Sequence, residues 1–334
     1  PAKASPGTAP WDDAAMRGPG SPRRLSASPY LLLGLATLFW AGNFVVGRAV
    51  GGRVPPLALA FWRWAVALAV ILPFAWRSLR AQAPVLGRAW PVLLPLGILG
   101  VGNFNTMVYL GLRETTATNA VLLNSACPAL IVALSSATGG GRPAARQVLG
   151  IAVSLAGVLA IVGRGTPASL LALAVNPGDL WVLGALASWA FYTVLLGRRP
   201  AGVDGLALLA ALVAVGLAWI APFYAWELAR GERLRLDAPA LGAIAYVGLF
   251  PSVASYVFWN RAVAEIGPSR AGVFIHLLPA FGAVLAVALL GESFRAFHLL
   301  GIALILAGVA LAGAARLPGR AVRAGAGGPR RDGL

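Results

Sequence analysis

The chain has 334 residues, of which 59% are hydrophobic and 11% are charged, and its mean hydropathy is +0.78. Soluble domains carry about 25% charged residues, so this composition excludes an ordinary soluble fold for most of the chain. The net charge of +16 comes almost entirely from arginines at the ends of apolar runs, which indicates membrane orientation rather than a nucleic-acid-binding face.

The predicted elements are ten membrane-spanning helices, since a crossing needs about 20 mostly apolar residues. Residues 1–28 and the basic tail 316–334 are predicted to be disordered and cytoplasmic. Arg23 and Arg24 resemble the start of a signal peptide, but the apolar run continues to Val50 without a cleavage site and is predicted to be the first span. In chain order the predicted spans are 29–50, 56–76, 90–112, 116–138, 144–163, 178–197, 205–227, 239–260, 268–290 and 296–314.

The basic residues predict the orientation of these spans. With a cytoplasmic N-terminus, eighteen basic residues fall in cytoplasmic segments and eight fall outside, and one lies within a span. Cytoplasmic loops carry the excess of Lys and Arg in membrane proteins. We therefore expect a multi-pass protein of the bacterial inner membrane with both termini in the cytoplasm.

An internal repeat divides the chain into two halves. The segment 150–158 (GIAVSLAGV) returns as 301–309 (GIALILAGV) with seven of nine residues identical, at an offset of 151. Five spans in each half place the halves in opposite senses in the bilayer, around a site near its midplane. The predicted fold is thus all-α, with two inverted five-helix repeats at 29–163 and 178–315, a connector at 164–177 and a central cavity.

These features resemble the EamA family of the drug/metabolite transporter superfamily. The second half carries Leu278-Pro279-Ala280, Leu290-Gly291-Glu292 and the glycine segment, and the first half repeats the proline at Pro128 and the glycine pair. The Gly-Glu pair becomes Gly-Gly at 140–141, which favours a structural role for Glu292 at a helix start. The resemblance implies export of amino acids or other small metabolites.

Two tryptophans at matching depth are the first candidates for a substrate site. Trp40 and Trp189 lie about twelve residues into their spans, whereas membrane tryptophans usually occupy the interfacial belts. Their position favours a shared cavity, with simple packing as the alternative. The tryptophans that fit the belts are Trp62, Trp76, Trp90, Trp181 and Trp226.

Asparagines are unusually dense in the first half. Asn43 lies three residues after Trp40 and so shares its helix face. Asn103 and Asn105 cannot share a face, so at most one of them is expected to face the cavity. Each asparagine has interhelical hydrogen bonding as its alternative role. The candidates include Asn43, Asn105 and Tyr109, and the wider group adds Asn119 and Asn124.

The second half contributes a polar and aromatic stripe. Spacing of i, i+3, i+4 and i+7 places four of its members on one helix face, toward the bundle interior. His276 either titrates or is a satisfied structural histidine. The candidate substrate-binding residues are Tyr192, Ser255, Tyr256, Trp259 and His276, with Ser252 on the same stripe.

Pro128 and Pro279 lie near the middle of their predicted spans and are candidate hinges, since proline kinks a helix. By contrast, the Ala152-xxx-Ala156 and Ala303-xxx-Ala307 patterns with their glycines indicate close helix packing, with a dimer contact left open.

Arg63 is the one arginine well inside a span, roughly 10 Å from its outer end at about 1.5 Å per residue. It pairs with a substrate carboxylate, snorkels outward or binds backbone carbonyls. A structural role is favoured, because Trp62 and Trp64 resemble interfacial anchors.

The leading hypothesis is an exporter of amino acids or related metabolites with aromatic or bulky apolar side chains, working by alternating access. Efflux of cationic drugs generally uses a carboxylate at mid-span, and the predicted spans contain none there. A drug or toxic-compound pump is therefore the less favoured alternative. A membrane-embedded lipid-modifying enzyme or a scaffold is less favoured. The expected partners are a small-molecule substrate and the lipid bilayer, with no nucleic acid, cofactor or metal, and the protein is expected to be monomeric, with a dimer left open.

Overall fold

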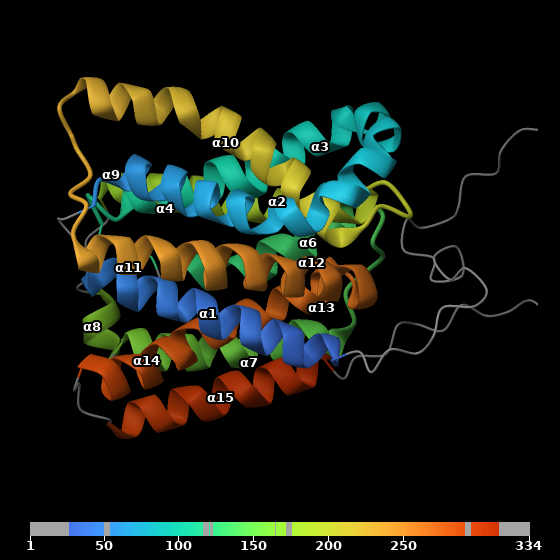
Figure 1. Ribbon diagram of the computed structural model, residues 1–334. Coiled ribbons are helices and arrows are strands. Elements are labelled where there is room, and N and C mark those ends of the chain that lie inside the picture. The colour runs from blue at the N-terminus through green and yellow to red at the C-terminus, as the bar shows by residue number, and fades with distance from the viewer. Residues whose placement is uncertain are drawn as a thin grey trace, which may run out of the picture.

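The structure is a computed structural model that describes residues 27–49, 54–115, 120, 123–163, 165–171, 176–290 and 295–313. Within these residues every regular element is a helix (Figure 1). The helices are α1 (Pro29–Ala49), α2 (Pro56–Arg88), α3 (Trp90–Leu96), η2 (Gly97–Asn103), α4 (Phe104–Gly111), α6 (Cys127–Ala137), α7 (Ala145–Val162), α8 (Pro167–Leu171), α9 (Pro177–Leu195), η3 (Leu196–Arg198), α10 (Gly205–Ala229), α11 (Ala238–Val247), η4 (Gly248–Ala254), α12 (Ser255–Ile266), α13 (Pro268–Val273), η5 (Phe274–His276), α14 (Leu277–Leu290) and α15 (Ala296–Gly313).

Eight helical segments of the described chain are long and apolar enough to cross a membrane. They overlap the predicted spans from the second onward, apart from the span at 116–138, but the helix predicted at 56–76 continues to Arg88 and the one predicted at 239–260 continues to Ile266. At 116–138 the described part is α6, with eleven residues, and much of what precedes it falls outside the described residues. The first predicted span is α1, with 21 residues. All five tryptophans assigned to the interfacial belts are between 40% and 62% exposed, as expected for side chains that face lipid or headgroups.

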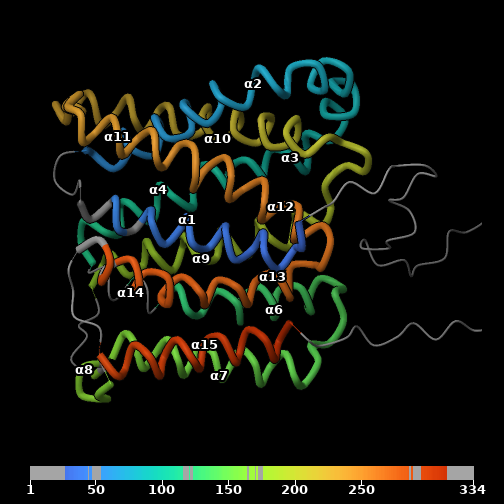
Figure 2. The backbone as a smooth tube through the Cα atoms, turned by 60° about the horizontal axis from the view of Figure 1, so that its bottom comes forward, coloured from blue at the N-terminus to red at the C-terminus, as the bar shows by residue number. Residues whose placement is uncertain are grey.

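The helices form a layered bundle with a long antiparallel pair at each edge. Helices α2 and α10 pack against each other at one edge, and α7 and α15 at the opposite edge (Figures 1 and 2). Between the pairs, α1 packs against α12 and α14, while α9 packs against α4 and α6. The central helices therefore come from both halves of the chain, and each of these contacts joins a helix of one half to a helix of the other.

The repeated glycine segments meet each other at the α7/α15 edge. A Cβ placed on Gly308 would lie 2.5 Å from the Gly150 carbonyl oxygen, and one on Gly157 would lie 2.6 Å from the Gly301 oxygen. Any side chain at these positions would collide with backbone, so glycine allows the helices to touch. The predicted close packing is confirmed and lies within one chain.

The alanine patterns beside these glycines do not form the contact. Ala152, Ala156, Ala303 and Ala307 are all exposed, on the outward face of the α7/α15 pair. Residues seven apart on a helix share a face, as Gly150 and Gly157 do, whereas a residue two positions away points elsewhere. The assignment of the alanines to a packing face within the bundle was therefore wrong.

In each half of the chain, one π-helical segment interrupts the third predicted span. η2 begins at Gly97 and η4 at Gly248, an offset of 248 − 97 = 151, the same as that of the sequence repeat. A π-turn leaves backbone carbonyls free of their usual i+4 partners, and such turns are frequent at functional sites. η2 packs on α10 and η4 packs on α2, so each interruption contacts the opposite half.

The two candidate hinge prolines follow interruptions of the α-helical pattern. Pro128 is the second residue of α6, and Pro279 is the third residue of α14, directly after the 3-10 turn η5. In the first turn the missing N–H of proline has no helical partner to lose. The α-helical pattern is therefore interrupted before both prolines, by a turn at residues 125–126 and by the 3-10 turn η5.

Candidate functional site

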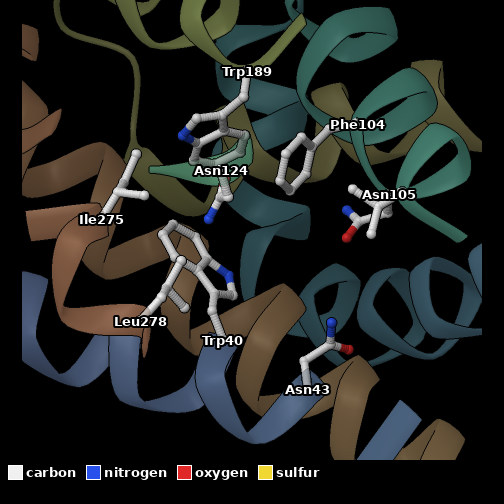
Figure 3. A pocket seen from close by; sticks show the side chains of 9 residues that line it. Trp40, Asn43, Phe104, Asn105, Asn124, Trp189, Ile275 and Leu278 are labelled. Atoms are coloured by element: carbon white, nitrogen blue, oxygen red, sulfur yellow. The ribbon is translucent and has the colours of Figure 1, made fainter. Parts of the chain in front are cut away.

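A pocket lies at the centre of the bundle, where α1, α4, α9 and the η5/α14 junction meet (Figure 3). It contains about 460 Å³ of space that no protein atom fills, open solvent at its mouth included. The residues that line it are Trp40, Asn43, Phe104, Asn105, Val108, Asn124, Trp189, Ile275 and Leu278.

Trp40 and Trp189 form one wall of the pocket. Their ring centroids are 5.2 Å apart in an edge-to-face arrangement, and Phe104 lies 4.9 Å from the Trp189 ring. The Trp40 indole Nε1 donates to the Pro251 carbonyl in the π-segment η4 at 3.0 Å. The two tryptophans thus line one pocket, and a backbone carbonyl of η4 orients one of them.

A second layer of aromatic rings closes one side of this wall. Trp259 lies 5.3 Å from the Trp40 ring and 5.5 Å from the Trp189 ring, and Tyr256 is 5.5 Å from Trp189. Tyr256 donates to the Gly100 carbonyl in η2 at 2.5 Å, and the Tyr192 hydroxyl donates to Asn260 Oδ1 at 2.6 Å. These rings are buried behind the pocket and do not line it.

A buried arginine organises the polar end of the pocket. Arg63 is 1% exposed. Its Nε donates to Ser252 Oγ at 2.8 Å, and its Nη1 donates to Asn105 Oδ1 at 2.9 Å. Nη1 also donates to the Tyr109 hydroxyl at 2.5 Å, and that hydroxyl donates in turn to Asn43 Oδ1 at 3.2 Å. Arg63 thus holds two of the pocket's carboxamides, that of Asn105 directly and that of Asn43 through Tyr109.

The surroundings of Arg63 differ from the sequence-based expectation. Its side chain neither snorkels to the surface nor binds backbone carbonyls, but bonds to three side chains from two helical segments, α4 and η4. The assignment of Trp64 as an interfacial anchor was wrong, because it is fully buried, whereas Trp62 is 40% exposed and donates to the Tyr224 hydroxyl at 3.0 Å. Residues two apart on a helix point to nearly opposite sides, so two flanking tryptophans cannot both face the headgroups.

The remaining candidates are buried in the surroundings of the pocket. His276 is fully buried, with Nε2 donating to the Ser125 carbonyl at 2.8 Å and Nδ1 bonded to Ser154 Oγ. Of the two alternatives for His276, the structure shows the structural one, with both ring nitrogens hydrogen-bonded. Ser255 donates to the Ala36 carbonyl at 3.1 Å and so ties α12 to α1. The predicted stripe faces the bundle interior, where it packs helices together.

Of the asparagines in the predicted group, Asn43, Asn105 and Asn124 line the pocket. Asn103 instead accepts a hydrogen bond from Trp219 of α10 at 2.8 Å, which confirms that it and Asn105 face different ways. Asn119 and Glu292 lie outside the described residues.

Four apolar lining residues were not predicted. These are Phe104, Val108, Ile275 and Leu278. An apolar side chain in a membrane helix carries no signal that separates a pocket from lipid. Ile275 had an indirect signal, since it precedes the singled-out His276 in a short segment before Pro279.

Apolar helices of membrane-crossing length around a central pocket define a multi-pass membrane protein. The sequence profile of the EamA-like transporter family matches residues 27–163 and again residues 176–314. The chain belongs to this family, as the resemblance of its motifs indicated. Its relatives are named as transporters, so the chain is a membrane transporter by family.

Individual relatives are similar along nearly their whole length. An uncharacterized transporter, YyaM, of Bacillus subtilis (strain 168) is 28% identical over 295 residues, covering 86% of this chain and 95% of that protein. A probable terminal-alkyne amino-acid exporter of Streptantibioticus cattleyicolor is 27% identical over 295 residues, covering 86% and 94%. A solved structure, titled only "Crystal structure of protein", aligns with a TM-score of 0.65 at 22% identity, covering 85% of this chain and 96% of that one, which supports the fold alone.

Proposed function

We propose that this protein exports amino acids or related small metabolites with bulky apolar side chains across the bacterial plasma membrane. The observation that carries the proposal is the central pocket with Trp40 and Trp189, one from each half of the chain, as its aromatic wall. Aromatic walls with a few placed polar groups are typical of small-molecule sites. The relative named as an exporter of a terminal-alkyne amino acid supports the same substrate class.

We infer ten spans in two inverted halves, at 29–163 and 178–315. Three reciprocal contacts support this arrangement. The repeated glycines pack Gly150 on Gly308 and Gly157 on Gly301, so each copy touches the other in the same way. Helix α1 contacts α12 while its counterpart α9 contacts α4, and the π-segments contact α2 and α10 in the same crossed fashion. Inverted repeats place substrate near the bilayer midplane, between the halves.

Alternating access then requires places where the helices bend at low cost. The breaks before Pro128 and Pro279, together with the π-segments η2 and η4, supply such places in both halves. The aromatic layer of Tyr192, Tyr256 and Trp259 blocks one side of the pocket. We propose that rocking about these breaks opens this layer and closes the opposite mouth.

The orientation proposed is a cytoplasmic location of both termini. A Cβ placed on Gly313 at the end of α15 would lie 3.8 Å from Tyr30 Cε1 near the start of α1, so the first and last helices share one end of the bundle (Figure 1). The excess of arginine in the segments on that side supports the cytoplasmic assignment.

The direct test is flux of labelled amino acids in proteoliposomes that contain the full chain. The panel contains phenylalanine, tryptophan, leucine and alanine, with a cationic dye as the drug-efflux alternative. We expect counterflow for the bulky apolar members. An intact protein that moves none of the amino acids, or moves only the dye, would overturn the proposal.

Substitution of the pocket wall sharpens this test. Trp189→Ala and Trp40→Ala are expected to lower flux roughly tenfold or more, since lost contact in an apolar pocket costs about 1–3 kcal/mol. The matched control is Trp181→Ala on the same helix as Trp189, because Trp181 is 42% exposed and is not among the residues that line the pocket. Equal effects of Trp181→Ala and Trp189→Ala would assign the loss to helix α9 rather than to the site.

A further inference from the structure

The polar end of the pocket is lined by two asparagines, Asn43 and Asn105, whose amide oxygens each already accept a hydrogen bond. Arg63 donates to Asn105 Oδ1, and Tyr109 donates to Asn43 Oδ1. Each bond fixes which end of the carboxamide is the oxygen, so the NH₂ group of each asparagine points the other way. Arg63 and Tyr109 thus determine how the carboxamides of Asn105 and Asn43 are oriented.

The NH₂ group of Asn105 forms no well-aligned hydrogen bond within the described residues, and the Tyr256 hydroxyl lies near it. Asn105 is 5% exposed and its Nδ2 is buried without a hydrogen bond. A buried donor without an acceptor is costly, and an absent ligand is one of the explanations for such a group. Asn105 lines the pocket opposite Asn43, and the two carboxamides project from α4 and α1 at the same end (Figure 3).

The charge behind these donors is positive and is not neutralised by its bonded partners. The acceptors of Arg63 are the hydroxyls of Ser252 and Tyr109 and the amide oxygen of Asn105, all neutral groups. The face of Tyr109 is 5.9 Å from the guanidinium carbon. Neutral acceptors satisfy the N–H groups of a buried guanidinium but leave its field, which favours an anion nearby.

The opposite end of the pocket is mostly apolar. Trp189, Ile275 and Leu278 line it, with the Asn124 carboxamide beside Trp189, and Phe104 and Val108 continue the apolar surface (Figure 3). A ligand that satisfies both ends therefore has an acceptor-rich anionic head and a bulky apolar tail. A carboxylate has up to four lone-pair sites for N–H donors and fits the head.

We propose that Asn43 and Asn105, positioned by Arg63 and Tyr109, form a carboxylate subsite, and that the carboxylate rather than the α-ammonium group is the head by which substrate is recognised. The protein then takes apolar carboxylates as a class, of which bulky amino acids are one kind. This inference rests on the proposed function for its physiological meaning, but binding tests it independently of flux.

The experiment compares two one-headed analogues of phenylalanine with the full chain in detergent and in proteoliposomes. Phenylacetate keeps the carboxylate and phenethylamine keeps the ammonium. We expect phenylacetate to bind, by calorimetry, and to compete with labelled phenylalanine roughly tenfold or more better than phenethylamine, as a charge-assisted hydrogen bond contributes about 1.5–3 kcal/mol. Equal or reversed preference overturns the subsite.

Asn105→Asp tests the residue itself without leaving Arg63 unpaired. The new carboxylate keeps an oxygen for Arg63, so the fold should persist, while the donor is lost and a negative charge enters the pocket. We expect phenylacetate binding to fall roughly tenfold or more and the preference to shift toward phenethylamine. The matched control is Asn103→Asp, two residues away, where the side chain accepts from Trp219 outside the pocket.

The outcomes separate this inference from the proposed function. Selective phenylacetate binding without any amino-acid flux would support the subsite and overturn the exporter. Amino-acid flux with equal sensitivity to both analogues, or Asn105→Asp with unchanged preference, would overturn the subsite and leave the exporter. An intact protein that binds neither analogue overturns the subsite whether or not flux is seen.

Discussion

The α7/α15 edge and the central pocket use the sequence repeat in opposite ways. At the edge the copies are almost identical, and their glycines make the same backbone contact twice. In the pocket the copies share the tryptophans at positions 40 and 189, while the asparagines come from the first half and Ile275 and Leu278 from the second. Identity produces a symmetric framework, and divergence produces a pocket whose two ends differ.

The difference follows from what each region must satisfy. Two helices in lipid gain stability from close backbone approach, which any side chain at the contact would prevent in both copies. A pocket that binds an asymmetric ligand gains nothing from symmetry, because the same residue in both copies would present the same group to both ends. We therefore expect damage at the edge to affect folding, and damage in the pocket to affect binding.

The largest expected effect is that of Gly308→Val at the edge. The new Cβ would lie 2.5 Å from both the Gly150 oxygen and the Ser154 nitrogen, so the backbones must separate. We expect about 3 kcal/mol of destabilisation, seen as loss of the monodisperse peak in detergent size-exclusion chromatography. The control is Ala307→Val, whose side chain is exposed on the same helix. Equal profiles for both variants would contradict the assigned role of the glycines.

The second-largest expected effect is a loss of substrate affinity on substitution of Arg63 at the pocket. Arg63→Lys keeps the charge but cannot reach Ser252, Asn105 and Tyr109 together, because these bonds use two nitrogens of a planar group. We expect a folded protein whose affinity for phenylalanine falls roughly tenfold, as at least one bond to a charged group is lost. Calorimetry measures the affinity and the chromatographic profile reports the fold. Unchanged affinity would show that Arg63 supports the helices and not the site.

Sequence alone predicted the framework further than the site. The offset of 151 brought out the glycine segments and the prolines, and a near-equal spacing paired the tryptophans, since a duplicated chain keeps such spacings. It did not reveal the π-segments, because nothing local distinguishes Gly97–Asn103 from an ordinary apolar helix.

Within the site, polarity against an apolar background separated Asn43 and Asn105 from their neighbours, and the helix period linked Asn43 to Trp40. The partners of Arg63 could not be predicted, because Ser252, Asn105 and Tyr109 are brought to it from α4 and η4 by tertiary packing. The same holds for Ile275 and Leu278, whose side chains resemble those that face lipid. The sequence pattern identifies polar residues, which are costly to bury in a membrane, but it does not identify the apolar side chains that shape the pocket.

The smallest expected effect compares two tryptophans that touch across the aromatic wall. Trp40 Nε1 donates to the Pro251 carbonyl, whereas Trp259 Nε1 is buried without a partner. Trp40→Phe removes a hydrogen bond and is expected to cost about 1 kcal/mol in unfolding free energy. Trp259→Phe removes an unsatisfied donor together with some ring contact, so these effects oppose each other and we expect a change near zero.

The measurement is the thermal midpoint of each variant in the same detergent, with phenylalanine counterflow as the second readout. Trp40→Phe should also slow counterflow, because it frees the π-segment η4 from the pocket wall at the place where we propose that the helices bend. A larger loss for Trp259→Phe than for Trp40→Phe would show that ring packing, not the bond to η4, holds the wall. The π-segment would then be a feature of helix packing alone, and the proposed bending at η4 would lose its link to the substrate site.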